Sequence, residues 1–119
     1  MRFDRLGLVA VFAGGCLGAL ARAGVAEAFP PHAAHWPWAT FVVNVAGAFA
    51  LGWFAVRVGQ RELQFLGAGV CGALTTFSTM QVELLLMLDA SRYGLAAAYA
   101  LVSVAAGYAA VAVAMRRTA

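Results

Sequence analysis

Residues 72–80 read Gly-Ala-Leu-Thr-Thr-Phe-Ser-Thr-Met, and they decide the fold because four hydroxyl side chains fall within five positions of a long apolar segment. The hydroxyl groups belong to Thr75, Thr76, Ser78 and Thr79. The hydrocarbon of a bilayer cannot solvate hydroxyl groups or a loosened backbone, so such a cluster persists only inside protein or along a polar pathway. The stretch therefore predicts a pore or binding element within a membrane-spanning segment.

The composition around this stretch is typical of an integral membrane protein. Hydrophobic residues make up 64% and charged residues 11% of the 119 residues, and the mean hydropathy is +0.85. A membrane-spanning helix needs roughly 20 apolar residues, and four segments qualify, at about 6–29, 38–56, 63–88 and 93–115. We therefore predict an all-α membrane protein with a single four-helix transmembrane domain over residues 1–119, which leaves no length for a soluble catalytic domain.

The third segment is too long to be one straight helix. Its 26 residues, at about 1.5 Å each, would extend beyond a hydrocarbon core of roughly 30 Å. Gly67, Gly69 and Gly72 precede the hydroxyl cluster and favour a break between Gly72 and Thr75, near the middle of the segment. Such a break frees backbone carbonyl groups at membrane depth, and a hard cation bound by oxygen atoms would satisfy them.

The first segment carries small residues and a charge on one stripe. Gly14, Gly18 and Arg22 recur at four-residue steps, so they share one helix face. The two glycines would allow close helix packing. Two interpretations of Arg22 stay open: it reaches the membrane surface as an interfacial residue, or it lines a water-filled vestibule that attracts anions.

The second and fourth segments add further hydrogen-bonding groups. Asn44 is the only amide in the uncharged stretch 38–56, and it shares a face with Thr40. Such an amide either joins two helices or offers its two N–H donors to an anion. In the fourth segment, Tyr99 and Ser103 place two hydroxyl groups at the same four-residue spacing.

Downstream of the expected break, the third segment presents two neighbouring stripes. Thr76, Thr79 and Glu83 fall on one face, and Phe77 and Met80 on the next. Hydroxyl groups can donate to an anion, and the edge of an aromatic ring is electropositive. The plainer alternative for Phe77 and Met80 is packing in the core. A charged Glu83 opposes an anion pathway unless it is protonated or held by nearby donors.

The basic residues act as signals of membrane orientation. All eight are arginine and they are scattered at segment ends, which argues against binding to nucleic acid. Arg92 alone lies on the side opposite the termini, and Arg22 lies inside the first segment. If the orientation is fixed, both termini are expected in the cytoplasm. The side shared by the termini and the second loop carries Arg2, Arg5, Arg57, Arg61, Arg116 and Arg117.

The motifs of all four segments together resemble the Fluc (CrcB) fluoride-channel family, and the string in the third segment is the most specific of them. These motifs are Gly14-Gly15-x-x-Gly18-Ala19-x-x-Arg22, Asn44-x-x-Gly47 with Phe49 and Gly52, Gly72-x-x-Thr75-Thr76-Phe77-Ser78-Thr79, and Ser103-x-x-x-Gly107.

The resemblance implies a subunit that pairs antiparallel with a second copy, two fluoride pathways of opposite direction, and a structural sodium ion at the dimer centre. Gly72 and Thr75 would supply backbone carbonyl groups to the sodium ion. No organic cofactor is expected. The fluoride pathway would include Arg22, Thr40, Asn44, Phe77, Ser78, Thr79, Met80, Glu83, Tyr99 and Ser103.

Two features depart from the family pattern. Met80 stands where the family usually has a second Phe, and its thioether lacks an electropositive ring edge. The arginine count of six against one suggests a fixed orientation, whereas a subunit that inserts both ways should have a balanced count. Both a homodimer and a pair with an oppositely oriented homologous subunit therefore stay open.

The function implied is passive export of fluoride across the cell (inner) membrane, which lowers fluoride toxicity. The sequence contains no ATP-binding loop, catalytic triad or redox motif, so no enzyme activity is expected. Two alternatives are a small four-helix proton-coupled exporter of cations or drugs, and a non-conducting partner subunit of a heterodimer. The exporter would need a membrane-embedded carboxylate in the first segment, and Glu27 lies only at its end.

Overall fold

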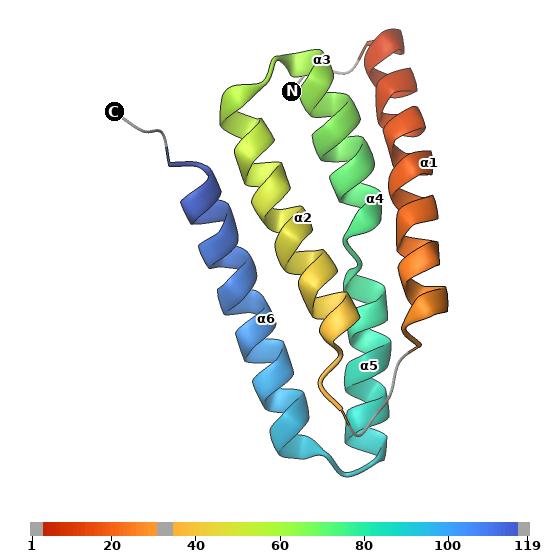
Figure 1. The fold of residues 1–119 in the computed structure, drawn as a ribbon, viewed down its shortest axis with the longest axis vertical. Coiled ribbons are helices and arrows are strands. Elements are labelled where there is room, and N and C mark those ends of the chain that lie inside the picture. Colours follow the sequence, from red (N-terminus) through yellow and green to blue (C-terminus); the bar gives the residue numbers. More distant parts are fainter. Residues whose placement is uncertain (1–3, 31–34, 117–119) are drawn as a thin grey trace.

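The structure is a computed structural model that describes residues 4–30 and 35–116, and all regular elements in these ranges are helices (Figure 1). Helices long and apolar enough to cross a membrane cover Arg5–Ala28, Trp38–Arg57, Gln60–Asp89 and Tyr93–Ala114. The predicted all-α class with four spans is confirmed. The largest difference lies at the second loop: the third span begins at Gln60 rather than at residue 63, because helical backbone follows Gly59 directly.

The third span consists of four consecutive pieces. They are α3 (Gln60–Glu62), the π-helical piece η1 (Leu63–Cys71), α4 (Gly72–Leu74) and α5 (Phe77–Asp89). Helices α1 (Arg5–Ala28), α2 (Trp38–Arg57) and α6 (Tyr93–Ala114) are each uninterrupted. The predicted break in the third span is therefore confirmed, and Figure 1 shows it as a short non-helical stretch between α4 and α5.

The four spans stand nearly side by side in a thin slab with extents of 47 × 34 × 21 Å (Figure 1). Helix α1 packs on η1 and α4, α2 packs on η1 and α6, and α5 packs on α6. The first half of the third span thus lies between α1 and α2, and its second half reaches α6. This arrangement places the break against Arg22 of α1 and Gly47 of α2.

Glycines allow the backbones of α1 and η1 to touch. A Cβ atom at Gly14 would overlap the Phe65 carbonyl oxygen, and one at Gly18 would overlap the Val70 carbonyl oxygen. From the other side, a Cβ at Gly69 would lie 2.9 Å from the Cα of Gly14. The small residues predicted from sequence therefore set the spacing that brings Arg22, one turn further along α1, up to the break.

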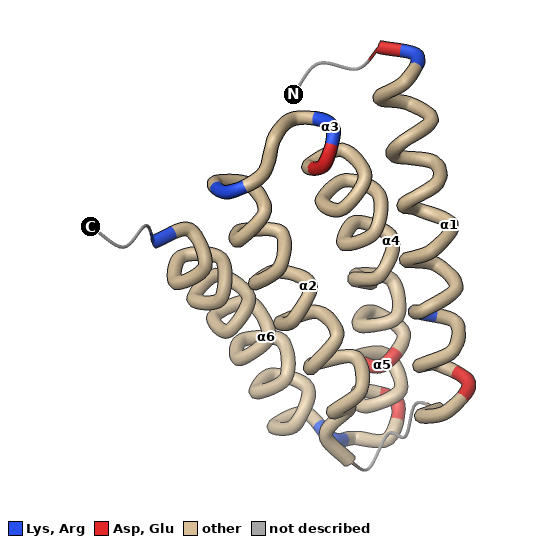
Figure 2. Tube along the Cα trace, turned by 45° about the horizontal axis from the view of Figure 1, so that its top comes forward, with Lys and Arg blue, Asp and Glu red and all other residues tan. Residues whose placement is uncertain are grey.

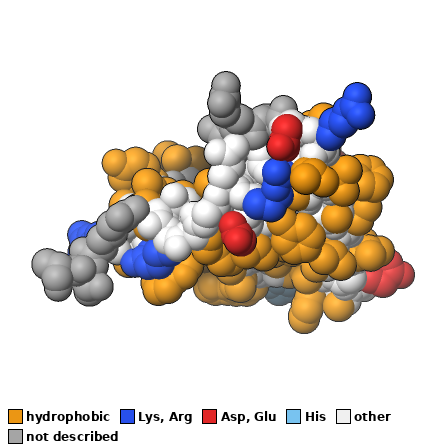
Figure 3. Space-filling view, turned by 90° about the horizontal axis from the view of Figure 1, so that it is seen from above, with side chains coloured by type: hydrophobic (Ala, Val, Ile, Leu, Met, Phe, Trp, Pro, Cys, Tyr) orange, Lys and Arg blue, Asp and Glu red, His pale blue; other side chains and the backbone are white. Residues whose placement is uncertain are grey.

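Most charged residues lie at the two ends of the slab (Figure 2), and hydrophobic side chains cover its flanks when it is viewed from one end (Figure 3). Large apolar side chains such as Phe12, Leu20 and Leu101 are more than two-thirds exposed, at 75%, 71% and 72%. In water this surface would be costly, but in a bilayer it faces lipid. The surface therefore agrees with a membrane location.

Two arginines fasten the end at which α1 begins and α6 finishes. Arg57 lies 3.7 Å above the Trp53 ring and donates to the carbonyl oxygens of Ala114 and Arg116 at 2.6 and 2.7 Å. It thereby satisfies carbonyl groups that the end of α6 leaves free. Of the arginines counted on this side, Arg2 and Arg117 lie outside the described residues.

A second contact, between Arg61 and Asp4, joins the start of the third span to the start of α1. Asp4 caps α1 by accepting from the Gly7 N–H at 2.7 Å, and its two carboxylate oxygens accept from Arg61 at 3.0 and 3.1 Å. The Arg61 guanidinium, followed by the Gly7 N–H, lowers the pKa of Asp4 from 3.8 to about 2. Because the folded-state pKa is depressed, this contact stabilises the fold above pH 3.8 and is lost as the pH falls through about 2.

The close approach of α1 and η1 yields a stability prediction with a matched control. Gly18→Ala adds one methyl group against the Val70 carbonyl, whereas Gly15→Ala adds it where no atom lies within 4 Å. Both variants gain the same helix propensity. We expect Gly18→Ala to lose about 1–3 kcal/mol of unfolding free energy in detergent, and Gly15→Ala to lose none. Equal stability of the two variants would show that α1 and η1 do not touch here.

Candidate functional site

The break is a two-residue interruption at Thr75 and Thr76. Their backbone angles are extended, with φ/ψ of −70°/149° at Thr75 and −143°/110° at Thr76. Thr76 begins the second half of the span as the N-cap of α5, because its Oγ1 accepts from the Thr79 N–H at 3.1 Å. The interruption therefore falls at the end of the predicted stretch 72–75 and extends one residue beyond it.

The side-chain amide of Asn44 on α2 pairs with both the backbone N–H and the backbone carbonyl of Thr76. Its Oδ1 accepts from the Thr76 N–H at 2.7 Å, and its Nδ2 donates to the Thr76 carbonyl at 3.2 Å. Both alternatives raised by the sequence are therefore compatible with the geometry. The amide joins α2 to the break, and it keeps a second N–H that these two bonds do not use.

Arg22 of α1 satisfies a carbonyl on the other side of the break. Its Nε donates to the Ala73 carbonyl at 3.0 Å, which has lost the helical donor that an unbroken chain would provide. The side chain is half-buried. Arg22 is therefore held at the break itself, and its position three-quarters of the way along α1 is fixed by a backbone contact rather than by reaching for the membrane surface.

The carbonyl groups of Gly72 and Thr75 are left available. The Thr76 N–H, which would continue the helix to the Gly72 carbonyl, donates to Asn44 instead. Within residues 4–30 and 35–116, no donor reaches the Thr75 carbonyl. Gly72 lies exposed on the surface of the subunit. Two free carbonyl oxygens at membrane depth suit a hard cation such as sodium, so the residues fit the predicted metal site.

Glu83 lies on α5 two turns beyond the break and is 4% exposed. Its two carboxylate oxygens accept from the hydroxyl groups of Thr40 on α2 and Tyr99 on α6, at 3.0 and 2.9 Å. The salt bridge found among the described residues involves Arg61 and Asp4, not Glu83. Three helices are therefore tied together by one carboxylate that neutral hydroxyl groups hold.

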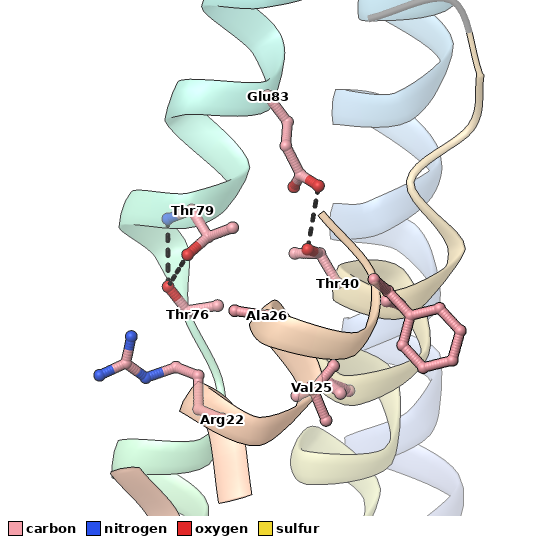
Figure 4. Close-up of a pocket in the computed structure, with 10 residues that line it drawn as sticks. Arg22, Val25, Ala26, Thr40, Thr76, Thr79 and Glu83 are labelled. Atoms are coloured by element: carbon pink, nitrogen blue, oxygen red, sulfur yellow. Dashed lines mark hydrogen bonds between the residues drawn. The ribbon is translucent and has the colours of Figure 1, made fainter. Parts of the chain in front are cut away.

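A cavity of about 40 Å³ brings five polar side chains together between α1, α2 and α5 (Figure 4). Its volume is enough for a water-sized ion or molecule. Figure 4 shows Arg22 and Thr76 at one end of the cavity and Glu83 with Thr40 at the other. The polar residues lining it are Arg22, Thr40, Thr76, Thr79 and Glu83.

The hydrogen bonds divide the hydroxyl groups of the predicted pathway, together with that of Thr76, into two groups. Thr40 and Tyr99 donate their hydrogens to Glu83, and Thr76 donates to the Thr79 Oγ1 at 3.0 Å. Those hydrogens are committed within the protein. The hydroxyl hydrogens of three residues have no acceptor in the described ranges and remain available to a ligand: Ser78, which is exposed, Thr79, and Ser103, whose Oγ is buried without a partner.

Phe77 and Met80, which the sequence placed on one stripe, have opposite environments. Phe77 is 69% exposed at the start of α5, while Met80 is 8% exposed and packs with Met87 and Tyr99 against α6. Met80 therefore has the packing role within this subunit, and Phe77 projects from it.

The structure thus brings most of the predicted site residues to the break or to Glu83, and leaves Gly72, Phe77 and Ser78 on an exposed face. The sequence placed Thr76 in the hydroxyl cluster and on a helix face, and in the structure its hydroxyl, N–H and carbonyl all hold the break. A threonine directly before the start of the resumed helix was the signal for this cap.

Four membrane-spanning helices around a break with free donors and free carbonyl groups define a small multi-pass membrane protein with a polar centre. The family model described as CrcB-like protein, Camphor Resistance (CrcB), matches residues 9–115. The chain belongs to this family.

Curated relatives cover most of the chain. It is 53% identical over 110 residues to "Fluoride-specific ion channel FluC 1" of Mycobacterium bovis. The aligned region covers 87% of this chain and 83% of that protein. It is 40% identical over 112 residues to "Fluoride-specific ion channel FluC" of Methylobacterium nodulans, with 89% and 90% covered. The protein of that name from Ignicoccus hospitalis is 41% identical over 110 residues, with 88% and 89% covered.

The contact between Asn44 and Thr76 predicts a large stability effect. Asn44→Leu keeps the branched shape and the number of side-chain heavy atoms but removes the partner of the Thr76 N–H and carbonyl, which costs about 1–3 kcal/mol for each group. The control is Val42→Leu, because Val42 lies two residues away on the same helix and is 55% exposed. Unfolding by denaturing detergent measures both, and an Asn44 variant as stable as the Val42 variant would contradict the contact.

Proposed function

We propose that this chain is a subunit of a fluoride-selective passive channel that lets fluoride leave the cell and thereby lowers its toxicity. The observation that carries the proposal is the break at Thr75 and Thr76, which gathers uncommitted donors at membrane depth. The choice of fluoride as the ion rests on the names of the relatives. Fluoride enters as neutral HF from an acidic medium and is trapped as the anion at cytoplasmic pH, so a passive anion pathway suffices for export.

The donors that would replace the hydration shell of fluoride come from both halves of the site. Asn44 offers its second N–H, and the hydroxyl groups of Ser78, Thr79 and Ser103 offer their hydrogens. Arg22 adds a positive charge next to Ala73. A narrow pathway with short-range donors favours the smaller ion over chloride, because only the smaller ion can approach all donors closely.

The exposed face around the break supports a dimer. Gly72, Phe77 and Ser78 are all exposed in the single subunit, and no atom lies within 4 Å of a Cβ placed at Gly107 on α6. An antiparallel second subunit would cover this face and would bring two Phe77 rings to the pathways. The free carbonyl groups of Gly72 and Thr75 would then face those of the partner and would hold the structural sodium ion between the subunits.

The partner is a second copy or an oppositely oriented homologous subunit in the cell (inner) membrane. Arginine gathers at the end where α1 begins and α6 finishes, with Arg5, Arg57, Arg61 and Arg116 in the described ranges and Arg92 at the other end. This bias favours cytoplasmic termini and one orientation. A chain held in one orientation needs a homologue inserted the other way to form an antiparallel pair.

Two other functions are less well supported. A proton-coupled cation exporter would need an embedded carboxylate on α1, but Glu27 is exposed at the end of that helix, and Arg22 would repel cations from the cavity that it lines. A non-conducting partner subunit differs from a channel subunit in flux alone, so the efflux experiment below separates the two.

The flux prediction uses liposomes that contain this chain alone and a fluoride electrode, with chloride efflux as the reference. We expect rapid fluoride efflux and no comparable chloride efflux. Phe77→Ala should lower the fluoride rate by about ten-fold or more, because it removes a ring edge from the pathway. The control is Phe12→Ala, since Phe12 is 75% exposed on the outer side of α1.

The outcomes of that experiment separate the alternatives. Well-folded protein without fluoride efflux would rule out a self-sufficient channel and point to a heterodimer or a non-conducting subunit. Equal fluoride efflux rates in the Phe77 and Phe12 variants would show that Phe77 does not line the pathway.

Removal of sodium tests the proposed ion at the dimer centre. Replacing sodium by a large organic cation on both sides should abolish fluoride efflux or dissociate the dimer, because the carbonyl groups of Gly72 and Thr75 would lose their partner. Light scattering in detergent and the efflux assay report the two effects. Unchanged dimer mass and unchanged efflux after exhaustive sodium removal would show that no structural sodium is needed.

A further inference from the structure

The motif Asn44-x-x-Gly47 of α2 places a buried glycine one turn after the side chain that pairs with Thr76. A Cβ atom at Gly47 would overlap the Cγ2 methyl group of Thr75. We propose that Gly47 is a positioning residue, which leaves room for the Thr75 methyl group and thereby sets the direction in which the Thr75 carbonyl points toward sodium. This inference rests on the proposed sodium site and adds a residue to it.

The contact at Gly47 differs from those of the glycines that pack one helix on another. A Cβ atom at Gly14, Gly18 or Gly52 would meet a backbone carbonyl oxygen of a neighbouring helix. Among the described residues, a Cβ at Gly47 would come within 4 Å of Thr75 side-chain atoms alone, Cγ2 and Cβ. Gly47 therefore makes room for one side chain of the break and not for a whole helix.

The Thr75 side chain cannot turn away from Gly47 without a loss. Its Oγ1 donates to the Cys71 carbonyl at 3.0 Å, and a threonine has three staggered rotamers. One of the other two rotamers would put Oγ1 where the methyl group now lies, still against Gly47. The last would put the methyl group where Oγ1 now meets the Cys71 carbonyl. A side chain at position 47 therefore breaks this hydrogen bond or shifts the Thr75 backbone.

The peptide unit between Thr75 and Thr76 is held by α2 at two points. The Thr75 carbonyl and the Thr76 N–H belong to one planar peptide unit, and Asn44 accepts from that N–H at 2.7 Å. Gly47 contacts the same unit from the Thr75 side, through the methyl group. The N–H and Oγ1 of Thr75 both donate to the Cys71 carbonyl, at 3.1 and 3.0 Å. The direction of the Thr75 carbonyl is thus fixed by neighbours on both sides.

A change in this direction should alter the affinity for sodium. The proposed ion is bound by the backbone carbonyl oxygens of Gly72 and Thr75, and α2 offers it no oxygen atom at Gly47. Replacing residues that hold metal ligands in position typically changes metal affinity by about 10–100-fold. The sodium concentration that the protein needs, and not only its stability, should therefore depend on Gly47.

The experiment follows the melting temperature and the dimer mass of the full chain in detergent over a range of sodium concentrations at constant ionic strength. An ion that binds the folded state raises its stability once the ion concentration exceeds the dissociation constant. We expect Gly47→Ala to raise the sodium concentration at which stabilisation begins by about ten-fold or more. The control is Gly52→Ala on the same helix, which places a methyl group 3.0 Å from the Val111 carbonyl oxygen of α6. It should lower the melting temperature without changing the sodium requirement.

A double variant tests whether the effect acts through the Thr75 methyl group. Thr75→Ser removes this methyl group and keeps the hydroxyl group. In the Thr75→Ser background, Gly47→Ala should change the sodium requirement less than two-fold, because the added Cβ no longer meets a methyl group. If Gly47→Ala by itself does not fold, the double variant should still fold and respond to sodium.

The outcomes separate this inference from the proposed sodium site. An equal effect of Gly47→Ala in both backgrounds, equal sodium requirements of Gly47→Ala and Gly52→Ala, or a double variant that does not fold would overturn the role of Gly47. Absence of any sodium effect on the wild type would instead overturn the sodium site itself.

Discussion

The structure depends on one constraint, which is that every backbone group freed at Thr75 and Thr76 must find a partner without help from water. Neighbouring helices provide most of these partners. Asn44 pairs with the N–H and carbonyl of Thr76, and Arg22 pairs with the carbonyl of Ala73. The close packing of α1 on η1, which the glycines permit, is what brings Arg22 within reach. The groups left over are the ones that can interact with ions.

The fold could largely be predicted from sequence, because the length and apolar composition of each segment set the spans directly. The break was predictable for the same physical reason, since 26 residues exceed the core thickness and glycines precede the hydroxyl cluster. The third helix begins three residues before the apolar segment, because Gln60, Arg61 and Glu62 are helical although they are polar. Hydropathy detects the membrane-embedded part of a helix and not its polar first turn.

The site was predictable as a set of residues but not as a set of bonds. Spacing placed Thr76, Thr79 and Glu83 on one face, and they do line one cavity. Spacing could not separate Phe77 from Met80, because their burial depends on where α5 meets α6. Nor could it show that Thr40 and Tyr99 donate to Glu83, or that the Thr75 methyl group lies against Gly47. These are tertiary contacts between segments far apart in the chain.

These hydrogen bonds separate the polar residues that stabilise the structure from those that can still bind an ion. The break is held by Asn44 and Thr76, and Glu83 is held by Thr40 and Tyr99. Hydroxyl hydrogens that can still be donated belong to Ser78, Thr79 and Ser103. The most direct test is electrical recording from the chain in planar bilayers with a fluoride gradient and symmetrical chloride. A reversal potential at the fluoride equilibrium potential would agree with a pathway built on these donors. Absence of current from folded protein, or a reversal potential that follows chloride, would contradict it.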